Sequence, residues 1–221
     1  MVIFFFENCN FEYKKIYFEQ KMDMKSYFEE KCKSAKTAND IRAIVEMIEK
    51  SMHSIKFNIP HYFYNDYIGW ALPTDQVCRL ILAFWKRYSE SKVIDLGCGS
   101  GFFCMMLHDC GIPKTKLMAL ETKIQKKATT LNFWEIKRDD DYEIDPNDIL
   151  LICWGTSAIS KRLESYIKRG GKYVLILGET KDGCTFPSDY FLSIMKWQCK
   201  MIHVQGPASN YSEYLSINVR C

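Results

Sequence analysis

Three glycines at alternate positions, Gly97, Gly99 and Gly101, directly follow a short apolar segment that contains Asp95. Glycine has no β-carbon, so this spacing predicts a bend with positive φ angles against which a ligand can lie closely. In an open α/β sheet, the first strand-to-helix turn lies beyond the carboxyl ends of the strands, where ligands bind. We therefore predict a ligand site here, with the start of the following helix facing the ligand.

The pattern distinguishes two classes of ligand. Dinucleotide binding favours G-x-G-x-x-G, but Phe102 occupies the place of the last glycine, and the motif reads G-x-G-x-G. The acid two residues before the first glycine suits a cationic ligand with an amino group better than a pyrophosphate. Glu121 ends the apolar run LMALE, where a carboxylate can accept hydrogen bonds from both hydroxyls of a ribose.

Strand and helix patterns alternate after residue 92, which predicts a mainly parallel sheet with helices on both faces. The strand patterns are residues 92–96, 116–121, 148–154, 172–179, 200–206 and 213–221, and the helix patterns are 101–111, 157–171 and 187–197. Only a turn separates the last two strands, so they should pair antiparallel. The expected fold is a Rossmann-like, doubly wound α/β sheet of about seven strands with an antiparallel C-terminal hairpin.

Capping residues predict the helix boundaries. Thr74 should cap a helix that runs to about residue 88, and Ser157 should cap the helix pattern that ends in Gly-Gly. Gly111 should end the helix after the glycine bend. In the N-terminal region, Asn39 or Asp40 should cap a helix whose apolar residues lie on one face.

The stretch DLGCGSG together with Glu121 resembles the cofactor motifs of class I S-adenosylmethionine-dependent methyltransferases. The resemblance covers about residues 70–221 and looks closest to an uncharacterised branch, through WALPT at 70–74, LLICWG at 150–155, and GET followed by GCT within 178–185. Members of that branch tend to read C-W-P-P after the fourth strand, where this chain has C-W-G-T. The resemblance implies S-adenosylmethionine as cofactor and leaves the methyl acceptor open.

The implied cofactor site is built on the bend and the neighbouring strand ends. The predicted cofactor-binding residues are Asp95, Gly97, Cys98, Gly99, Gly101, Phe102, Glu121, Trp154 and Trp70. Asp95 and the glycines would hold the methionine and sugar portions, Glu121 would hold the ribose, and the two tryptophans would form walls.

The acceptor side has weaker candidates. Trp154 could stack a planar acceptor or close the edge of the core, and Thr156 or Ser157 could offer a hydroxyl. Glu179, after the fifth strand, is either a polar group of the site or a solvated acid, and His61 is the histidine to test as a base. No catalytic residue is assigned beyond these three candidates, Trp154, Glu179 and His61.

No metal site is expected, because Asp148 precedes the fourth strand instead of following it. The acidic run Asp139–Asp141 is interpreted as a solvated loop, of which one residue could reach the adenine amine. The net charge of +3 permits a nucleic-acid partner without favouring one.

Ten scattered cysteines without a CxxC pair indicate reduced thiols in the cytoplasm or the nucleus. No apolar run reaches membrane-spanning length, so no membrane partner is expected. Residues 1–69 are expected to form a helical extension and residues 70–221 the methyltransferase domain.

The predicted function is methyl transfer from S-adenosylmethionine, with a nucleic acid or protein acceptor slightly favoured over a small metabolite. The alternative is a binding or scaffolding subunit that keeps the fold without transferring methyl groups, which the altered C-W-G-T loop suggests. A dinucleotide-dependent oxidoreductase would require NAD affinity, which Phe102 disfavours.

Overall fold

The computed structural model describes residues 26–27, 30–52, 74–121, 132–155, 159–179, 197–205 and 212–220. The chain divides into two units, Met1–Phe57 and Asn58–Cys221, which are described separately. The boundary expected between residues 69 and 70 lies outside the described residues. None of the helices in the described ranges has the length and apolar character needed to cross a bilayer.

In the first unit, helix α2 (Ala38–Met52) begins with a reciprocal cap. Thr37 Oγ1 accepts a hydrogen bond from the Asp40 amide (3.2 Å), and Asp40 Oδ2 accepts one from the Thr37 amide (2.9 Å). This is the geometry of a capping box with an aspartate in the third helical position. The expectation that Asn39 or Asp40 is the cap was therefore wrong, because Thr37 takes that role. Ile41 is buried, as the apolar pattern predicts.

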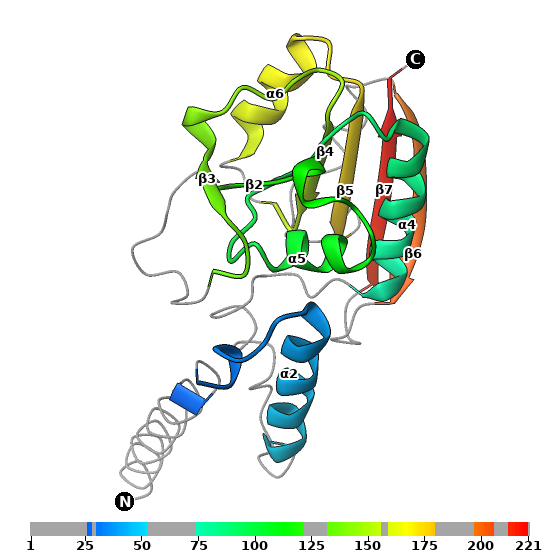
Figure 1. Ribbon diagram of the computed structural model, residues 1–221. Helices are drawn as coiled ribbons and strands as arrows, with labels where there is room; N and C mark the ends of the chain where they lie inside the picture. Colours follow the sequence, from blue (N-terminus) through cyan, green and yellow to red (C-terminus); the bar gives the residue numbers. More distant parts are fainter. Residues whose placement is uncertain are drawn as a thin grey trace, which may run out of the picture. The chain divides into compact units, whose positions relative to one another are not determined.

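In the second unit, seven described strands form one sheet in the order β3-β2-β1-β4-β5-β7-β6 (Figure 1). The strands are β1 (Val93–Leu96), β2 (Leu117–Glu121), β3 (Ile136–Arg138), β4 (Ile149–Cys153), β5 (Tyr173–Glu179), β6 (Gln198–Gln205) and β7 (Ser212–Val219). Strands β3, β2, β1, β4 and β5 are parallel, whereas β7 pairs antiparallel with both β5 and β6. The predicted fold class, including the C-terminal hairpin, is confirmed.

Strand β3 is the element that the sequence did not locate. It has three residues, of which Lys137 and Arg138 are exposed, so it shows neither the length nor the buried apolar run of its neighbours. The register ties Ala119 of β2 to Ile136 and Glu121 to Arg138. Its partner β2 therefore defines this edge strand more than its own residues do.

The helices of the second unit begin and end close to the predicted positions. Helix α4 (Asp75–Trp85) is capped by Thr74, whose side chain accepts from the Val77 amide (3.4 Å), and its predicted last turn is the 3-10 helix η1 (Lys86–Tyr88). Helix α5 (Phe102–Asp109) is followed by Gly111 at φ 117°. Between α5 and β2 lies the 3-10 helix η2 (Lys114–Lys116).

Helix α6 (Ser160–Lys168) starts later than expected. Ile159 occupies its N-cap position without a side-chain hydrogen bond, and Ser157, the predicted cap, lies outside the described residues, as does segment 187–196, for which a helix was expected. The predicted Gly-Gly end is confirmed, with Gly170 at φ 89°. A β-carbon on Gly171 would lie 2.3 Å from the Tyr166 ring, so the second glycine makes room for that ring.

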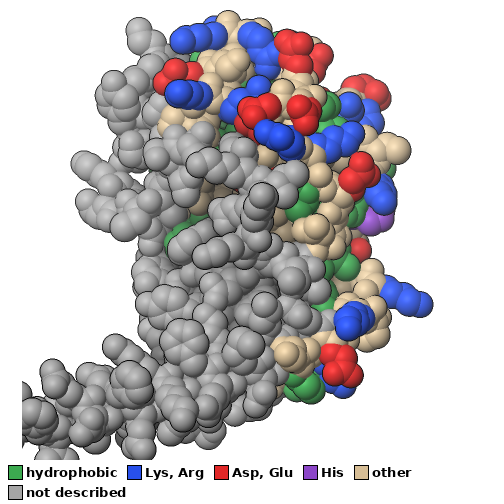
Figure 2. Space-filling model, turned by 90° about the vertical axis from the view of Figure 1, so that its left-hand side faces the viewer, with side chains coloured by type: hydrophobic (Ala, Val, Ile, Leu, Met, Phe, Trp, Pro, Cys, Tyr) green, Lys and Arg blue, Asp and Glu red, His purple; other side chains and the backbone are tan. Residues whose placement is uncertain are grey.

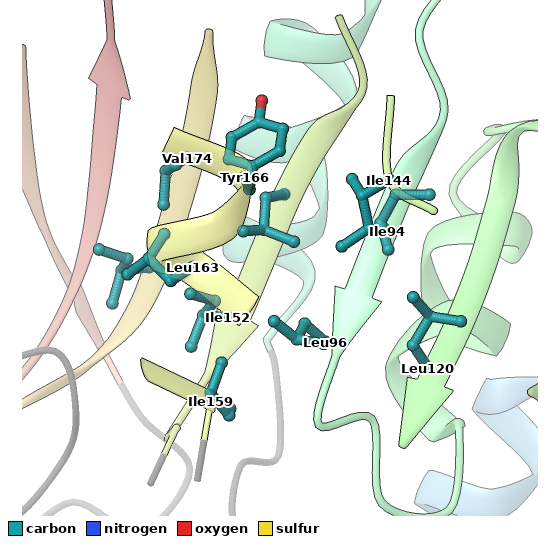
Figure 3. Packing of buried hydrophobic residues seen from close by; sticks show 11 residues of the cluster. Ile94, Leu96, Leu120, Ile144, Ile152, Ile159, Leu163, Tyr166 and Val174 are labelled. Carbon is teal, nitrogen blue, oxygen red and sulfur yellow. The ribbon is translucent and has the colours of Figure 1, made fainter. Parts of the chain in front are cut away.

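Helix α6 covers one face of the sheet with an apolar core (Figure 3). Its N-cap residue Ile159 and its residues Leu163 and Tyr166 pack against alternate residues of the central strands. Those strand residues are Ile94, Leu96, Leu120, Leu150, Ile152, Val174 and Ile176. Because side chains alternate between the two faces of a strand, Asp95, Ala119 and Leu151 point to the opposite face, which α5 covers.

The connection from β3 to β4 contains no α-helix. It consists of the 3-10 helix η3 (Asp139–Asp141) and the segment 142–148. The Arg162 guanidinium on α6 forms an ion pair with the Asp139 carboxylate and donates to the Asp139 carbonyl (2.8 Å). Asp139 is 2% exposed, so the interpretation of residues 139–141 as a solvated loop was wrong for Asp139. Burial raises the pKa of this carboxyl, and the Arg162 charge opposes that rise.

Charges are mixed on the face that Figure 2 shows. In the described part of this face, Lys and Arg side chains are interspersed with Asp and Glu. Ion pairs of the described residues include Arg169 with Glu143 and Lys168 with Glu164. This agrees with the small net charge of the chain.

Candidate functional site

Two acids lie on the α5 face of the sheet, near the carboxyl ends of adjacent parallel strands. Asp95 of β1 pairs in register with Ala119 of β2. Glu121 follows Ala119 by two residues, so the alternation of side chains along β2 places it on the same face as Asp95. The sheet therefore brings together the two carboxylates that the sequence proposed for one ligand.

Asp95 is buried without full satisfaction of its hydrogen bonds. The residue is 1% exposed, and Oδ1 has no hydrogen-bond partner among the described residues. Oδ2 lies 3.9 Å from the Cys104 Sγ on α5. Burial, followed by the nearby charge of Glu121, raises the pKa of Asp95 to about 7. A buried carboxylate oxygen without a partner is costly, which makes this atom the natural place for a donor from a ligand.

Glu121 is held against the glycine bend. Its Oε2 accepts a hydrogen bond from the Gly99 amide at 3.0 Å. A carboxylate has about four lone-pair sites on its two oxygens, so it can accept from more than one donor. This hydrogen bond links the end of β2 to the bend after β1.

The three glycines have the backbone conformation that the sequence predicts. Their φ angles are 79° at Gly97, 55° at Gly99 and 75° at Gly101. The expectation that the missing β-carbons make room for a ligand needs correction at two of them. A β-carbon on Gly97 would lie 2.9 Å from Ile159 Cδ1, and one on Gly101 would lie 2.7 Å from Trp134 Cβ. At these two positions the glycines make room for the protein's own side chains.

The amides of the bend are also used within the chain. Gly97 and Cys98 both donate to the Leu120 carbonyl (2.8 and 3.1 Å), and Gly101 donates to the Cys98 carbonyl (2.9 Å). The sequence predicts that a ligand lies closely against this bend, but these three amides already donate within the chain. The helix that follows, α5, starts at Phe102 without a side-chain cap, so the prediction that its first turn faces the ligand stays open.

Two further residues of the predicted cofactor site, Phe102 and Cys98, are buried to different degrees. The Phe102 ring is 2% exposed and packs edge-on against the Phe133 ring, with 5.3 Å between centroids. Cys98 is half-buried, and its thiol lies 3.9 Å from the Gly99 carbonyl. Burial raises the pKa of the Cys98 thiol, and that of Cys104 as well. These thiols stay protonated at neutral pH and are poor nucleophiles.

Trp154 marks the carboxyl end of β4. It is the described non-glycine residue with a positive φ, 46°, a conformation that is uncommon for a bulky side chain and is often found at functional sites. Its amide donates to the Leu177 carbonyl of β5 at 2.8 Å. The ring is half-buried. This geometry keeps Trp154 as the candidate for the acceptor side.

The remaining predicted residues can be placed only in part. Glu179 is the last residue of β5 and pairs with Glu213 of β7, while its side chain is not described. His61, Trp70, Thr156 and Ser157 lie outside the described residues.

Asp148, for which the sequence predicts no role in a metal site, bonds the backbone instead. Its Oδ1 accepts from the Lys92 amide at 2.9 Å, just before β1. In the ranges that the structure describes, no three or more His, Cys, Asp or Glu residues are grouped so that they could hold a metal ion.

Sequence reasoning missed the segment that follows residue 131. The Phe133 amide donates to the Ser100 carbonyl at 2.9 Å, and Trp134 lies against Gly101. The sequence contains aromatic residues here, but it offers no periodic signal that ties them to a bend about thirty residues earlier.

Comparison with known proteins finds likeness at the level of structure. No protein-family model matches the sequence, and no curated protein matches it. The chain is similar to an O-methyltransferase from Bacillus cereus in complex with SAH (9% identity, 80% of this chain and 100% of that chain, TM-score 0.48). It is also similar to cofactor-bound Rv0187 from MTB (13% identity, 85% of this chain and 99% of that chain, TM-score 0.47). A third similar structure is the methyltransferase domain of bacterial CtHen1 (13% identity, 65% of this chain and 97% of that chain, TM-score 0.40). We interpret the site from its residues and its strand order.

Proposed function

We propose that this chain binds S-adenosylmethionine at the glycine bend and transfers its methyl group to an acceptor at the carboxyl end of β4. The observation that carries the proposal is the buried Asp95 Oδ1 without a partner among the described residues. A ligand with an ammonium group would provide the missing donor and a compensating charge. The motif DLGCGSG supports the same cofactor.

The residues of the site fit the parts of this cofactor. Asp95 offers a buried carboxylate for the ammonium group, and the second carboxylate, Glu121, offers acceptors for the two ribose hydroxyls. When bound, the cofactor supplies a methyl group on a sulfonium, which is a good leaving group. The protein's part is alignment of the two reactants and exclusion of water.

On the acceptor side, we propose that Trp154 forms a wall. Its positive φ sets the direction of the side chain at the end of β4, and its ring offers a flat surface for a planar acceptor. A nucleic acid or protein acceptor is slightly favoured over a small metabolite, as the sequence suggests.

Calorimetric titration of the full chain with S-adenosylmethionine tests the cofactor assignment. We expect binding to the wild type and at least a tenfold rise in Kd for Glu121→Ala, because a charge-assisted hydrogen bond contributes about 1.5–3 kcal/mol. Glu121→Gln should fall between them, because an amide oxygen can still accept from Gly99. The matched control is Glu164→Ala, an exposed carboxylate on α6.

Two outcomes would contradict the assignment. If the wild type gave no heat with S-adenosylmethionine, the cofactor assignment would be wrong. A clear signal with NAD in the same titration would favour the oxidoreductase alternative. An unchanged Kd in Glu121→Ala would remove the ribose role of that residue.

Transfer itself is tested separately from binding. The chain is incubated with methyl-labelled S-adenosylmethionine and fractions of RNA, protein and small molecules. Label in one fraction, reduced in Trp154→Ala, supports transfer. Binding without label in any fraction would favour the scaffolding alternative, to which the C-W-G-T loop after β4 also points.

A further inference from the structure

The glycine bend is held along its length by residues of β2 and of the connection that follows it. The Leu120 carbonyl accepts from the Gly97 and Cys98 amides, and the Glu121 carboxylate accepts from the Gly99 amide. The first half of the bend is therefore tied to the end of β2.

The second half of the bend is held by residues 132–135, which we call the strap. The strap directly precedes β3. The Phe133 amide donates to the Ser100 carbonyl at 2.9 Å, and Ser100 itself is 1% exposed. The Phe133 ring also packs against Phe102, the first residue of α5. These contacts join the strap to the point where the bend becomes a helix.

Trp134 is the residue of the strap that meets the third glycine. A β-carbon on Gly101 would lie 2.7 Å from Trp134 Cβ and 3.3 Å from the Trp134 amide nitrogen. The indole is held in turn by two neighbours. The His108 ring of α5 lies edge-on to it at 5.6 Å between centroids, and Lys114 Nζ lies 5.5 Å from its centroid. The third glycine is thus required by a protein contact that a side chain at 101 would break.

We propose that Trp134 is a positioning residue. Its indole, held by His108 and Lys114, keeps its Cβ and backbone against Gly101 and so holds the bend in its binding conformation before the cofactor arrives. The inference rests on the proposed function, since it concerns the same cofactor site. A bend that is already ordered loses less conformational freedom on binding, and this preorganisation increases affinity. Trp134 acts on the cofactor through Gly101.

The contact is tested first without any ligand, through the thermal midpoint of the full chain. Gly101→Ala should lower the midpoint, because a β-carbon meets Trp134 and because alanine disfavours a φ of 75°. Trp134→Gly in the same chain removes the opposing Cβ and should restore part of the loss. Trp134→Ala keeps that Cβ and should restore nothing. Each double variant is compared with its own single variant at position 134, because Trp134→Gly and Trp134→Ala differ in stability by themselves. The loss caused by Gly101→Ala should be smaller beside Trp134→Gly than beside Trp134→Ala, and this difference isolates the contact.

The positioning role is tested by titration with S-adenosylmethionine. Trp134→Ala, which keeps Cβ but loses the ring that contacts His108 and Lys114, should raise Kd by about tenfold. Trp134→Phe, which keeps an aromatic ring, should stay within about threefold of the wild type. The control is Ile81→Val, a fully buried residue of α4, which should lower the midpoint and leave Kd unchanged. This control separates loss of stability from loss of positioning.

The outcomes distinguish this proposal from the one on which it rests. A wild type that does not bind S-adenosylmethionine overturns both. A wild type that binds, together with an unchanged Kd in Trp134→Ala, overturns the positioning role alone. An equal loss of midpoint on Gly101→Ala in the Trp134→Gly and the Trp134→Ala backgrounds overturns the contact.

Discussion

Polar groups are buried under a helix on both faces of the sheet, but their hydrogen bonds are satisfied to different degrees. On the α6 face, the Tyr166 hydroxyl lies 2.7 Å from the Asp148 carbonyl, to which it donates, and accepts from the Lys172 and Tyr173 amides at 3.0 Å each. On the α5 face, Asp95 has one carboxylate oxygen without a partner among the described residues. Both residues are essentially inaccessible to solvent.

This difference separates a structural role from a ligand-binding role. Tyr166 joins the residues before β4 to those before β5 and needs nothing from outside the chain. Arg169 Nε also has no partner among the described residues, but other nitrogens of the same guanidinium bond Glu143 and the Ile144 carbonyl. Asp95 has a weak thiol contact and a pKa raised by burial, so it is the group that a ligand would stabilise.

The largest effect on stability is expected for Tyr166→Phe. The change removes the acceptor of the Tyr173 amide and the donor to the Asp148 carbonyl in the core, while the Lys172 amide keeps the Pro146 carbonyl at 3.0 Å. We expect a loss of about 3 kcal/mol in the free energy of unfolding. Urea unfolding measures it, and the Kd for S-adenosylmethionine should not change. The control is Tyr142→Phe, whose hydroxyl accepts from the Lys92 ammonium at 3.2 Å on the half-exposed rim. An equal loss of unfolding free energy in Tyr142→Phe would contradict the idea that burial makes the Tyr166 hydroxyl more important.

Asp95→Asn should affect binding and stability in opposite directions. We expect a Kd for S-adenosylmethionine about a hundredfold higher, because the ligand's ammonium loses a buried ionic partner. The thermal midpoint without ligand at pH 8 should rise, because a buried charge without a partner is removed. Titration and thermal unfolding of the same sample measure both quantities.

The same substitution at a satisfied carboxylate provides the control. Asp139→Asn breaks the ion pair with Arg162, so its midpoint should fall. If Asp95→Asn and Asp139→Asn shifted the midpoint in the same direction, the contrast between the two faces would not hold.

A smaller effect is expected from pH. The pKa of Asp95 in the folded chain is about 7, above its ordinary value of 3.8, so between these values only the folded state holds the proton. Unfolding then releases a proton, and the contribution of Asp95 to stability is lost as pH rises from about 4 to about 7. We expect the wild type to lose about 2 kcal/mol relative to Asp95→Asn between pH 5 and pH 7. Urea unfolding of both proteins across this range measures the difference, and parallel curves would contradict it.

Affinity for the cofactor should have the opposite dependence on pH. A cation binds the ionised form of Asp95, so binding releases a proton and strengthens as pH rises towards 7. Calorimetry in two buffers of different ionisation enthalpy measures the proton release in the wild type. Asp95→Asn should not show it.

Much of the fold was readable from local patterns. The apolar runs of β1, β2, β4 and β5 are short and continuous, as in strands that are buried on both faces, and the helices carry caps or glycines at their ends. Thr74 and Gly111 act where the sequence placed them. Strand β3 could not be found, because its three residues are stabilised by pairing with β2.

The candidate site was also readable in part. Asp95, the three glycines and Glu121 form a recognisable motif, because positive φ angles favour glycine and the two acids stand at or near the ends of recognisable apolar strands. The contact of Trp134 with Gly101 could not be predicted from residue types, because it depends on how the chain folds back to the bend. The same is true of Asp139, whose partner Arg162 lies on a helix two elements later.

The sequence by itself determined the strands other than β3, the glycine bend and the two acids that accompany it, since each depends on residues close to one another in the chain. Only the tertiary structure decided which polar groups are satisfied. It tied the bend amides to Leu120, paired Asp139 with Arg162 and left Asp95 Oδ1 without a partner among the described residues. The physical reason is that a hydrogen bond between distant residues depends on where the backbone places both partners, and no local pattern records that distance.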